Sequence, residues 1–314
     1  MATDWSIAES ASVPKTGPDT GPGEDRLLVR DDDGLVLVAV IDGATDKAGR
    51  RYEGRTGGEL AADCVEDTLR HALLPVAGGP AGLVAAITAG LTRTRHAFGV
   101  DPDDPVAPSA VAAVFLPEQE IVVRVGDVHL ALRRGDAWQQ MPAHKEIDDQ
   151  AAHIRAAHLT RWILGGTPEA DLAANDPGRE LILPRLVQQH LFANRPGGHP
   201  LAFGVLDGRT EVPPEFVEVF DTAGADEVVL ATDGYLAPHP TLAEAEQQLR
   251  ASLLADPLRI GTHPATKGVT PGNVSFDDRI YLRAVRHSSR QAGAPRTAQD
   301  QAPTSHMLPA SKEH

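Results

Sequence analysis

The chain has 314 residues, of which 41% are apolar and 23% charged, values typical of a globular protein with a sizeable buried core. Its formal net charge of −15 argues against nucleic acid or an anionic membrane surface as the main partner. The single cysteine, Cys64, excludes an internal disulfide and any metal cage built from several cysteines. No apolar run reaches the length of a membrane span and the N-terminus lacks a secretory signal pattern, so we expect a cytoplasmic protein.

The N-terminal region is predicted to lack regular structure up to about residue 22. Prolines and glycines are frequent between positions 14 and 22, so residues 1–22 are expected to form an extended, flexible lead-in. The next two segments, Leu27–Arg30 and Leu35–Ile41, are strand-like and flank the turn sequence DDDG. They should therefore pair as a hairpin.

The remainder of the chain is predicted to mix helices and strands. One helix opens with the capping-box spacing from Thr56 to Glu59, and a second has apolar residues at helical spacing between Leu83 and Phe98. The later segments with strand character are 109–116, 120–125, 128–134, 201–206, 216–220, 228–232 and 279–285, and a further helix is expected over 241–255. Strands, helices and more strands in this order indicate one α+β domain over residues 23–286.

Two segments differ in composition from this pattern. Residues 143–195 are rich in Ala, His, Gln, Arg and Leu, and we expect them to form a helical insert between strands. Residues 287–314 are rich in Ser, Ala, Pro and Gln, and we expect a disordered tail.

Five short acidic motifs lie at the edges of predicted strands: Glu24-Asp25, Asp42-Gly43, Gly126-Asp127, Asp233-Gly234 and Asp277-Asp278. Each alone has an ordinary explanation, because Asp-Gly is a common turn and Gly126-Asp127 could simply close a hairpin. Asp42 and Asp233, however, end strands that are apolar on both faces, which places them near the middle of a sheet. Carboxylates converging there would repel one another unless a cation such as Mg²⁺ or Mn²⁺ offset their charge.

The motifs GEDRLLV, VAVIDG, RVGDVHLAL, EVVLATDGYL and VSFDDRIYLR, in this order, resemble those of the metal-dependent protein phosphatases of type 2C, the PPM family, in its bacterial form. The resemblance covers about residues 20–286. It implies a four-layer αββα sandwich with two central antiparallel sheets flanked by helices, and a helical flap insert at about 143–195. It also implies hydrolysis of phosphoserine or phosphothreonine on proteins through a metal-activated water, with two Mg²⁺ or Mn²⁺ ions and a possible third.

The resemblance also implies a role for each acidic motif. Asp42 would bridge two metals, and the carbonyl of the following glycine would assist. Glu24 and Asp25 would act mainly through metal-bound waters, and Asp127 with Asp233 would form the looser third site. The expected metal ligands are Glu24, Asp25, Asp42, Gly43, Asp127, Asp233 and Asp277.

Two positions depart from the family pattern. Ala44 stands where some members carry a histidine after Asp-Gly, and Thr20 stands where many carry a phosphate-gripping arginine. Lys15, Lys47 or Lys267 could replace that arginine as a point charge, and Lys267 is the first choice among the three because its loop precedes the last acidic motif. Taken alone, Lys267 still reads more readily as a solvated loop lysine. The expected catalytic residues are Asp42, Asp233 and Lys267.

Two alternative functions stay open at this point. The same fold could hydrolyse a small-molecule phosphate ester, or it could be a catalytically silent relative that serves as a binding module. The presence of Asp42, Asp127, Asp233 and Asp277 counts against the silent module. The expected partner is therefore a phosphorylated protein or a small phosphate ester, with no nucleic acid and no membrane; the sequence does not fix the oligomeric state.

Overall fold

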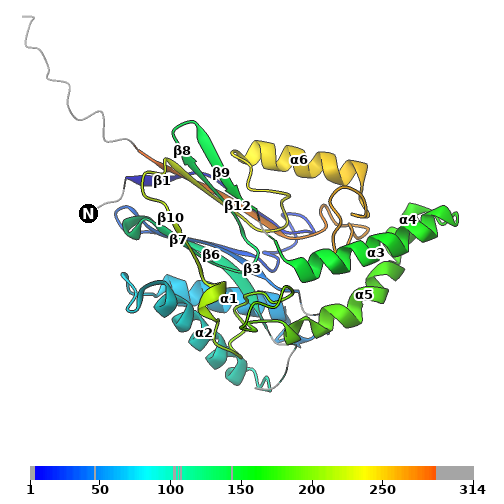
Figure 1. Ribbon diagram of the computed structural model, residues 1–314, viewed down its shortest axis with the longest axis horizontal. Coiled ribbons are helices and arrows are strands. Elements are labelled where there is room, and N and C mark those ends of the chain that lie inside the picture. The colour runs from blue at the N-terminus through cyan, green and yellow to red at the C-terminus, as the bar shows by residue number, and fades with distance from the viewer. Residues whose placement is uncertain are drawn as a thin grey trace, which may run out of the picture.

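The computed structural model describes residues 4–45, 47–101, 104, 106, 108–142 and 144–287. Two five-stranded antiparallel sheets form its centre (Figure 1). In spatial order the first sheet contains β1 (Trp5–Val13), β12 (Arg279–Arg286), β11 (Glu227–Ala231), β8 (His129–Arg134) and β9 (Ala137–Met141). The second contains β10 (Glu218–Asp221), β7 (Ile121–Val125), β6 (Ala110–Leu116), β3 (Leu35–Gly43) and β2 (Arg26–Asp31). A two-stranded ribbon pairs β4 (Arg51–Tyr52) with β5 (Arg55–Thr56).

Helices cover the outer face of each sheet. The second sheet carries α1 (Gly57–Arg70) and α2 (Gly79–Ala97), and the first carries α6 (Leu242–Ala255). A lobe of three helices, α3 (Glu146–Leu164), α4 (Glu169–Ala174) and α5 (Pro177–Val187), projects from one end of the sandwich (Figure 1). The short 3₁₀ turns are η1 (Pro117–Gln119), η2 (Gln188–Leu191) and η3 (Pro214–Phe216). None of the described helices combines the length and apolar character that a bilayer span requires.

Strand β3 shows why both faces of a central strand are apolar. Val38 and Val40 point between the two sheets, where they pack in one core with residues of β8, β11 and β12. Leu37, Ala39 and Ile41 point the other way and pack against α1 and α2. A third core lies between the first sheet and α6. These layers confirm the predicted α+β class and the four-layer αββα sandwich.

Helix α1 begins where its capping box predicts. The Thr56 hydroxyl accepts a hydrogen bond from the backbone N–H of Glu59 at 3.1 Å, and the Glu59 carboxylate accepts one from the N–H of Thr56 at 2.6 Å. Reciprocal bonds of this kind satisfy donors that a helix start leaves free. The cap fixes the first turn of α1 beside the end of β3.

Two expectations about local structure are wrong, and so is the alternative in which Gly126-Asp127 closes a hairpin. Residues 5–13 are not part of a flexible lead-in but form β1, because Trp5 and Ile7 pack into the inter-sheet core while the strand pairs along β12. Segments 121–125 and 129–134 do not form a hairpin, since β7 and β8 belong to different sheets. Segment 201–206 is not a strand; it makes only single bridges, from Phe203 to Ala193 and from Leu206 to Ala110.

The other segments behave as their patterns predict. Strands β2 and β3 pair as the expected hairpin, and the described part of 143–195 is mainly helical. The predicted tail, apart from His287, lies outside the described residues.

Candidate active site

The fold brings the predicted acidic residues to one end of the two sheets. Asp42 lies at the end of β3 opposite Val111 of β6, and Asp233 follows β11, so each comes from a strand inside its sheet. Asp127 lies in the short connection between β7 and β8, which belong to different sheets, and so it lies near both sheets. Asp42, Asp127, Asp233 and Asp277 line one cleft.

Glycines allow the motif backbones to pack against one another. A Cβ at Gly43 would lie 2.4 Å from the carbonyl oxygen of Glu24 and 2.5 Å from that of Gly58, the second residue of α1. A Cβ at Gly234 would lie 2.0 Å from the carbonyl oxygen of Asp278. These distances exclude any side chain, so each glycine lets one acidic motif approach the next.

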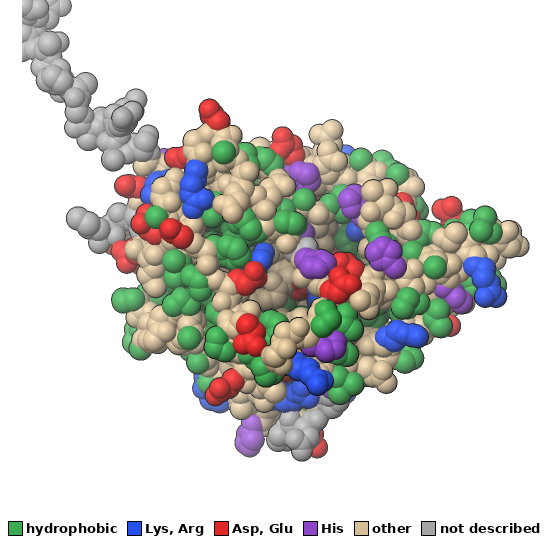
Figure 2. Space-filling view, viewed as in Figure 1, with side chains coloured by type: hydrophobic (Ala, Val, Ile, Leu, Met, Phe, Trp, Pro, Cys, Tyr) green, Lys and Arg blue, Asp and Glu red, His purple; other side chains and the backbone are tan. Residues whose placement is uncertain are grey.

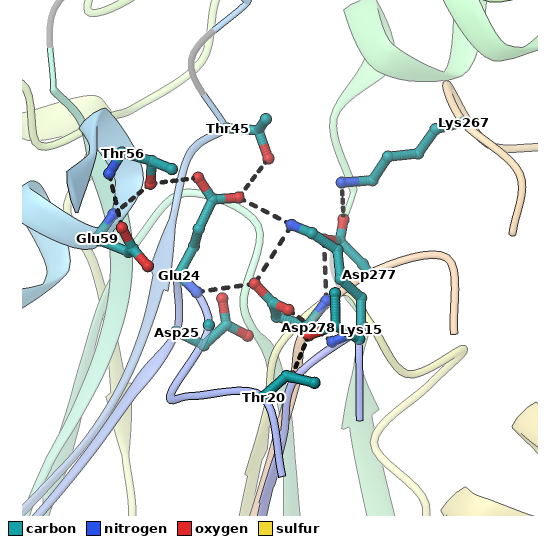
Figure 3. A network of polar contacts seen from close by, with 12 residues as sticks. Lys15, Thr20, Glu24, Asp25, Thr45, Thr56, Glu59, Lys267, Asp277 and Asp278 are labelled. Atoms are coloured by element: carbon teal, nitrogen blue, oxygen red, sulfur yellow. Dashed lines mark hydrogen bonds and ion pairs between the residues drawn. The ribbon is translucent and has the colours of Figure 1, made fainter. Parts of the chain in front are cut away.

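Lys15 holds part of the acidic cluster together (Figure 3). Its Nζ lies 3.0 Å from Glu24 and 3.4 Å from Asp278, and the Asp278 carboxylate also accepts the backbone N–H groups of Lys15 and Glu24 at 2.7 and 2.8 Å. Glu24 accepts two further hydrogen bonds, from the hydroxyls of Thr56 at 2.7 Å and Thr45 at 2.8 Å. Glu24 and Asp278 therefore already have partners within the protein.

A second lysine neutralises Asp277. Lys267 Nζ lies 2.7 Å from this carboxylate, and Lys15 Nζ lies 3.9 Å from it. Burial alone would raise the pKa of Asp277, but the two lysines outweigh that effect and hold it below its usual value. The pKa of Glu24 is lowered in the same way: burial opposes the shift, and Lys15, Thr56 and Thr45 produce it.

For three other carboxyls the compensation is too weak to offset burial and repulsion, and we call them the uncompensated carboxyls. Burial, followed by the charges of neighbouring aspartates, raises the pKa of Asp25 and of Asp42 well above the usual value. Desolvation and the carboxylates of Asp277 and Asp127 raise the pKa of Asp233 to about 7. Because the Asp233 side chain is solvent-exposed, we attribute more of its shift to these neighbouring charges than to burial. The cluster thus has an excess of negative charge centred on these three residues.

The uncompensated carboxyls fit divalent cations. Asp25 Oδ2 is buried and has no hydrogen-bond partner among the described residues, as expected for an oxygen aimed at an ion. Hard carboxylate oxygens suit Mg²⁺ or Mn²⁺, whose positive charge would offset the repulsion.

The spacing of these oxygens bears on how many ions would bind. Over the described ranges, the group whose ligand atoms all lie within 4.8 Å of one another is His144, Glu146 and Asp149, at the start of α3, and not the predicted aspartates. A single ion would therefore not touch three of the predicted ligands at once in this arrangement. An ion held by at most two of these carboxylates would complete its shell with water.

Another part of the cleft lining is basic, and we call it the basic side. Lys47, Lys145, Arg179 and Lys267 line it together with Asp148. Lys47 and Lys267 were among the candidates from the sequence, but Lys145 and Arg179 were missed. They come from the flap helices, and no local pattern in the sequence indicates which flap side chains face the cleft.

Comparisons with solved structures find bacterial serine/threonine phosphatases. The Mycobacterium tuberculosis phosphatase PstP/Ppp is 19% identical, with a TM-score of 0.47, 90% of this chain covered and 99% of that chain. Stp1 from Staphylococcus aureus is 15% identical, with a TM-score of 0.48 and coverages of 92% and 98%. A further match, the catalytic domain of PstP solved with two manganese ions, is 19% identical, with a TM-score of 0.47 and coverages of 90% and 97%. No curated protein sequence matches the chain.

The family comparison is decisive for classification. The model described as protein phosphatase 2C matches residues 19–257, well over half of the chain, and this range contains the first four of the five acidic motifs. The chain therefore belongs to the protein phosphatase 2C family.

Proposed function

We propose that this chain is a Mg²⁺- or Mn²⁺-dependent phosphatase that hydrolyses phosphoserine and phosphothreonine on proteins. Membership of the protein phosphatase 2C family supports the reaction class. The observation that carries the proposal is the convergence of Asp42, Asp127, Asp233 and Asp277 on one cleft. The buried Asp25 oxygen, which has no partner among the described residues, adds to it.

The proposed ion-binding residues fall into two groups. Asp42, Asp127 and Asp233 line the cleft and would contact the ions directly, with the buried oxygen of Asp25 behind them. Asp277 would join them once Lys267 moved from its present position at 2.7 Å. When bound, two divalent ions lower the pKa of a water and offset the charge on the transferring phosphoryl group.

The remaining residues would position this group rather than bind ions. Glu24 uses both oxygens on Thr45, Thr56 and Lys15, so it ties the start of α1 to the acidic cluster instead of contacting an ion. Lys267 lies at the boundary between the acidic and basic sides of the cleft. Released from Asp277, its ammonium group would be a point charge for a phosphoryl oxygen.

Activity against Mn²⁺ concentration, for the native chain and for Asp233→Asn, tests the proposal. We expect the variant to lose at least about a hundredfold in hydrolysis of p-nitrophenyl phosphate, because the ions would be misassembled. The matched control is Asp67→Asn on α1, whose carboxylate is 77% exposed and outside the cleft, and it should keep native activity.

The outcomes also separate the alternatives. Equal activity of Asp233→Asn and the native chain would contradict the site. Absence of metal-dependent activity in the native chain would favour a silent binding module. Hydrolysis of small phosphate esters but not of phosphopeptides would favour a metabolite substrate.

A further inference from the structure

Two cations on the basic side of the cleft have no ion-pair partner in the described ranges of the chain. Lys47, in the loop after β3, and Arg179, in the first turn of α5, make no ion pair within 4.0 Å among the residues that the structure describes. Within the described part of the chain the Arg179 guanidinium donates one hydrogen bond, to the carbonyl of Thr266 at 3.0 Å. Both side chains are only partly exposed and line the cleft.

The neighbouring charged groups are already paired. Lys145 Nζ lies 2.9 Å from Asp148 and 4.3 Å from the centre of the Phe203 ring, and Lys267 is bound to Asp277. Asp148 is shared further, because it also accepts a hydrogen bond from the side-chain amide of Gln189. The single charge of Asp148 therefore cannot neutralise Lys145, Lys47 and Arg179 together.

Burial and the nearby positive charges of Lys145, Lys267 and Arg179 lower the pKa of Lys47 to about 8, although Asp148 opposes the shift. A partly buried lysine among other positive charges is strongly stabilised when an anion binds beside it. Among the described cations of the basic side, Lys267 pairs with an aspartate expected to bind ions, at 2.7 Å from Asp277, whereas neither Lys47 nor Arg179 lies within 4.0 Å of such an aspartate. Lys267 is thus the cation placed for the phosphoryl group beside those aspartates, and Lys47 and Arg179 are left for a second anion.

We propose that Lys47 and Arg179 bind an acidic side chain of the substrate, close in sequence to its phosphorylated residue. This inference rests on the proposed function, since it assigns the phosphoryl group to the aspartate side of the same cleft. The two sides of the cleft would then contact two different negative groups on one substrate. The enzyme would prefer phosphopeptides with Asp or Glu next to the phosphoresidue.

Two phosphothreonine peptides test the preference directly. They differ only at the two residues that flank the phosphothreonine, which are Asp in one and Asn in the other. Fluorescence anisotropy in EDTA measures their affinity without turnover. We expect the native chain to bind the Asp peptide at least about tenfold more tightly, as charge-assisted hydrogen bonds imply. The preference should shrink as sodium chloride is raised, because salt screens these charges.

Variants identify the residues responsible. Lys47→Met combined with Arg179→Met should abolish the preference, whereas Arg185→Met, an exposed arginine on the same helix outside the cleft, should retain it. The charge-preserving Lys47→Arg with Arg179→Lys should restore at least part of it, which separates loss of charge from misfolding.

Each outcome decides one claim. Equal affinity of the native chain for both peptides, or a preference that survives the double methionine variant, would overturn the inference. If the preference is present but neither peptide is hydrolysed with Mn²⁺, the proposed function fails and the anion subsite stands.

Discussion

Gly43→Ala tests how closely the acidic motifs depend on backbone contact. The new Cβ would lie 2.4 Å from the Glu24 carbonyl oxygen and 2.5 Å from the Gly58 carbonyl oxygen. Ordinary contacts begin near 3.4 Å, so the end of β3 must move by about 1 Å from both neighbours. Both obstacles are backbone atoms, one leading into β2 and the other in the first turn of α1, so neither can rotate away.

The expected cost follows from this geometry. Overpacking in a rigid environment destabilises by about 1–3 kcal/mol, and we expect the upper end, about 3 kcal/mol, because two backbone segments must shift. For a chain of this size that corresponds to a melting temperature lower by about 5 °C. The shift would also displace Asp42, so Mn²⁺ should raise the melting temperature of the variant less than that of the native chain.

Thermal unfolding with and without Mn²⁺ measures both effects. Gly165→Ala is the control, since its φ is −78° and a Cβ there would meet the carbonyl oxygens of Trp162 and Arg161 at 3.3 and 3.4 Å, close to ordinary contact. It should change the melting temperature by no more than about 1 °C. If Gly43→Ala changes the melting temperature as little as Gly165→Ala does, the close contact of Gly43 with the backbones of Glu24 and Gly58 is not needed to hold the site.

Three further predictions concern charge. Metal-free Asp233→Asn should be more stable than the native chain at pH 8 but not at pH 4. The pKa of Asp233 rises to about 7 on folding, so this carboxyl lowers the free energy of unfolding of the native chain as pH rises from about 4 through 7. Parallel curves of unfolding free energy against pH for the two proteins would contradict this. Lys15→Met should lower the free energy of unfolding, measured in urea, by about 2 kcal/mol, because Glu24 and Asp278 lose a shared and mostly buried cation. An unchanged urea midpoint would show that these contacts do not contribute to stability. Arg155→Met should speed hydrogen exchange in α5 and around residues 259–267. The buried Arg155 guanidinium connects these segments, because it pairs with Asp176 at 2.7 Å and donates to the carbonyl of Ala265 at 3.0 Å. Exchange at the native rate in both segments would show that Arg155 does not stabilise them.

The sequence predicts the acidic side of the site well because strand patterns report position within a sheet. Residues that precede Asp42 and Asp233 are apolar on both faces, and such strands lie inside sheets covered on two sides. The structure brings Asp25, Asp42, Asp127, Asp233 and Asp277 together, and their roles in binding ions stay predictions.

Features that depend on distant contacts could not be read from the sequence. The link at Gly126-Asp127 has the composition of a hairpin turn, and only the packing of β7 and β8 in different sheets shows that it is a crossing. Lys15 lies 263 residues from Asp278 in the sequence, so their pairing leaves no local signal. The same holds for Lys145 and Arg179, whose place in the cleft depends on how the flap helices sit against the loop around Thr266.

The pairing of β12 with both β1 and β11 has a consequence for biosynthesis. During synthesis, Asp277 and then β12 leave the ribosome after every other described strand. Until then β1 has no partner strand and β11 has one open edge, so the nascent chain exposes two sites for mispairing. Dephosphorylation by this chain would therefore start only after its last strand has emerged and closed the first sheet.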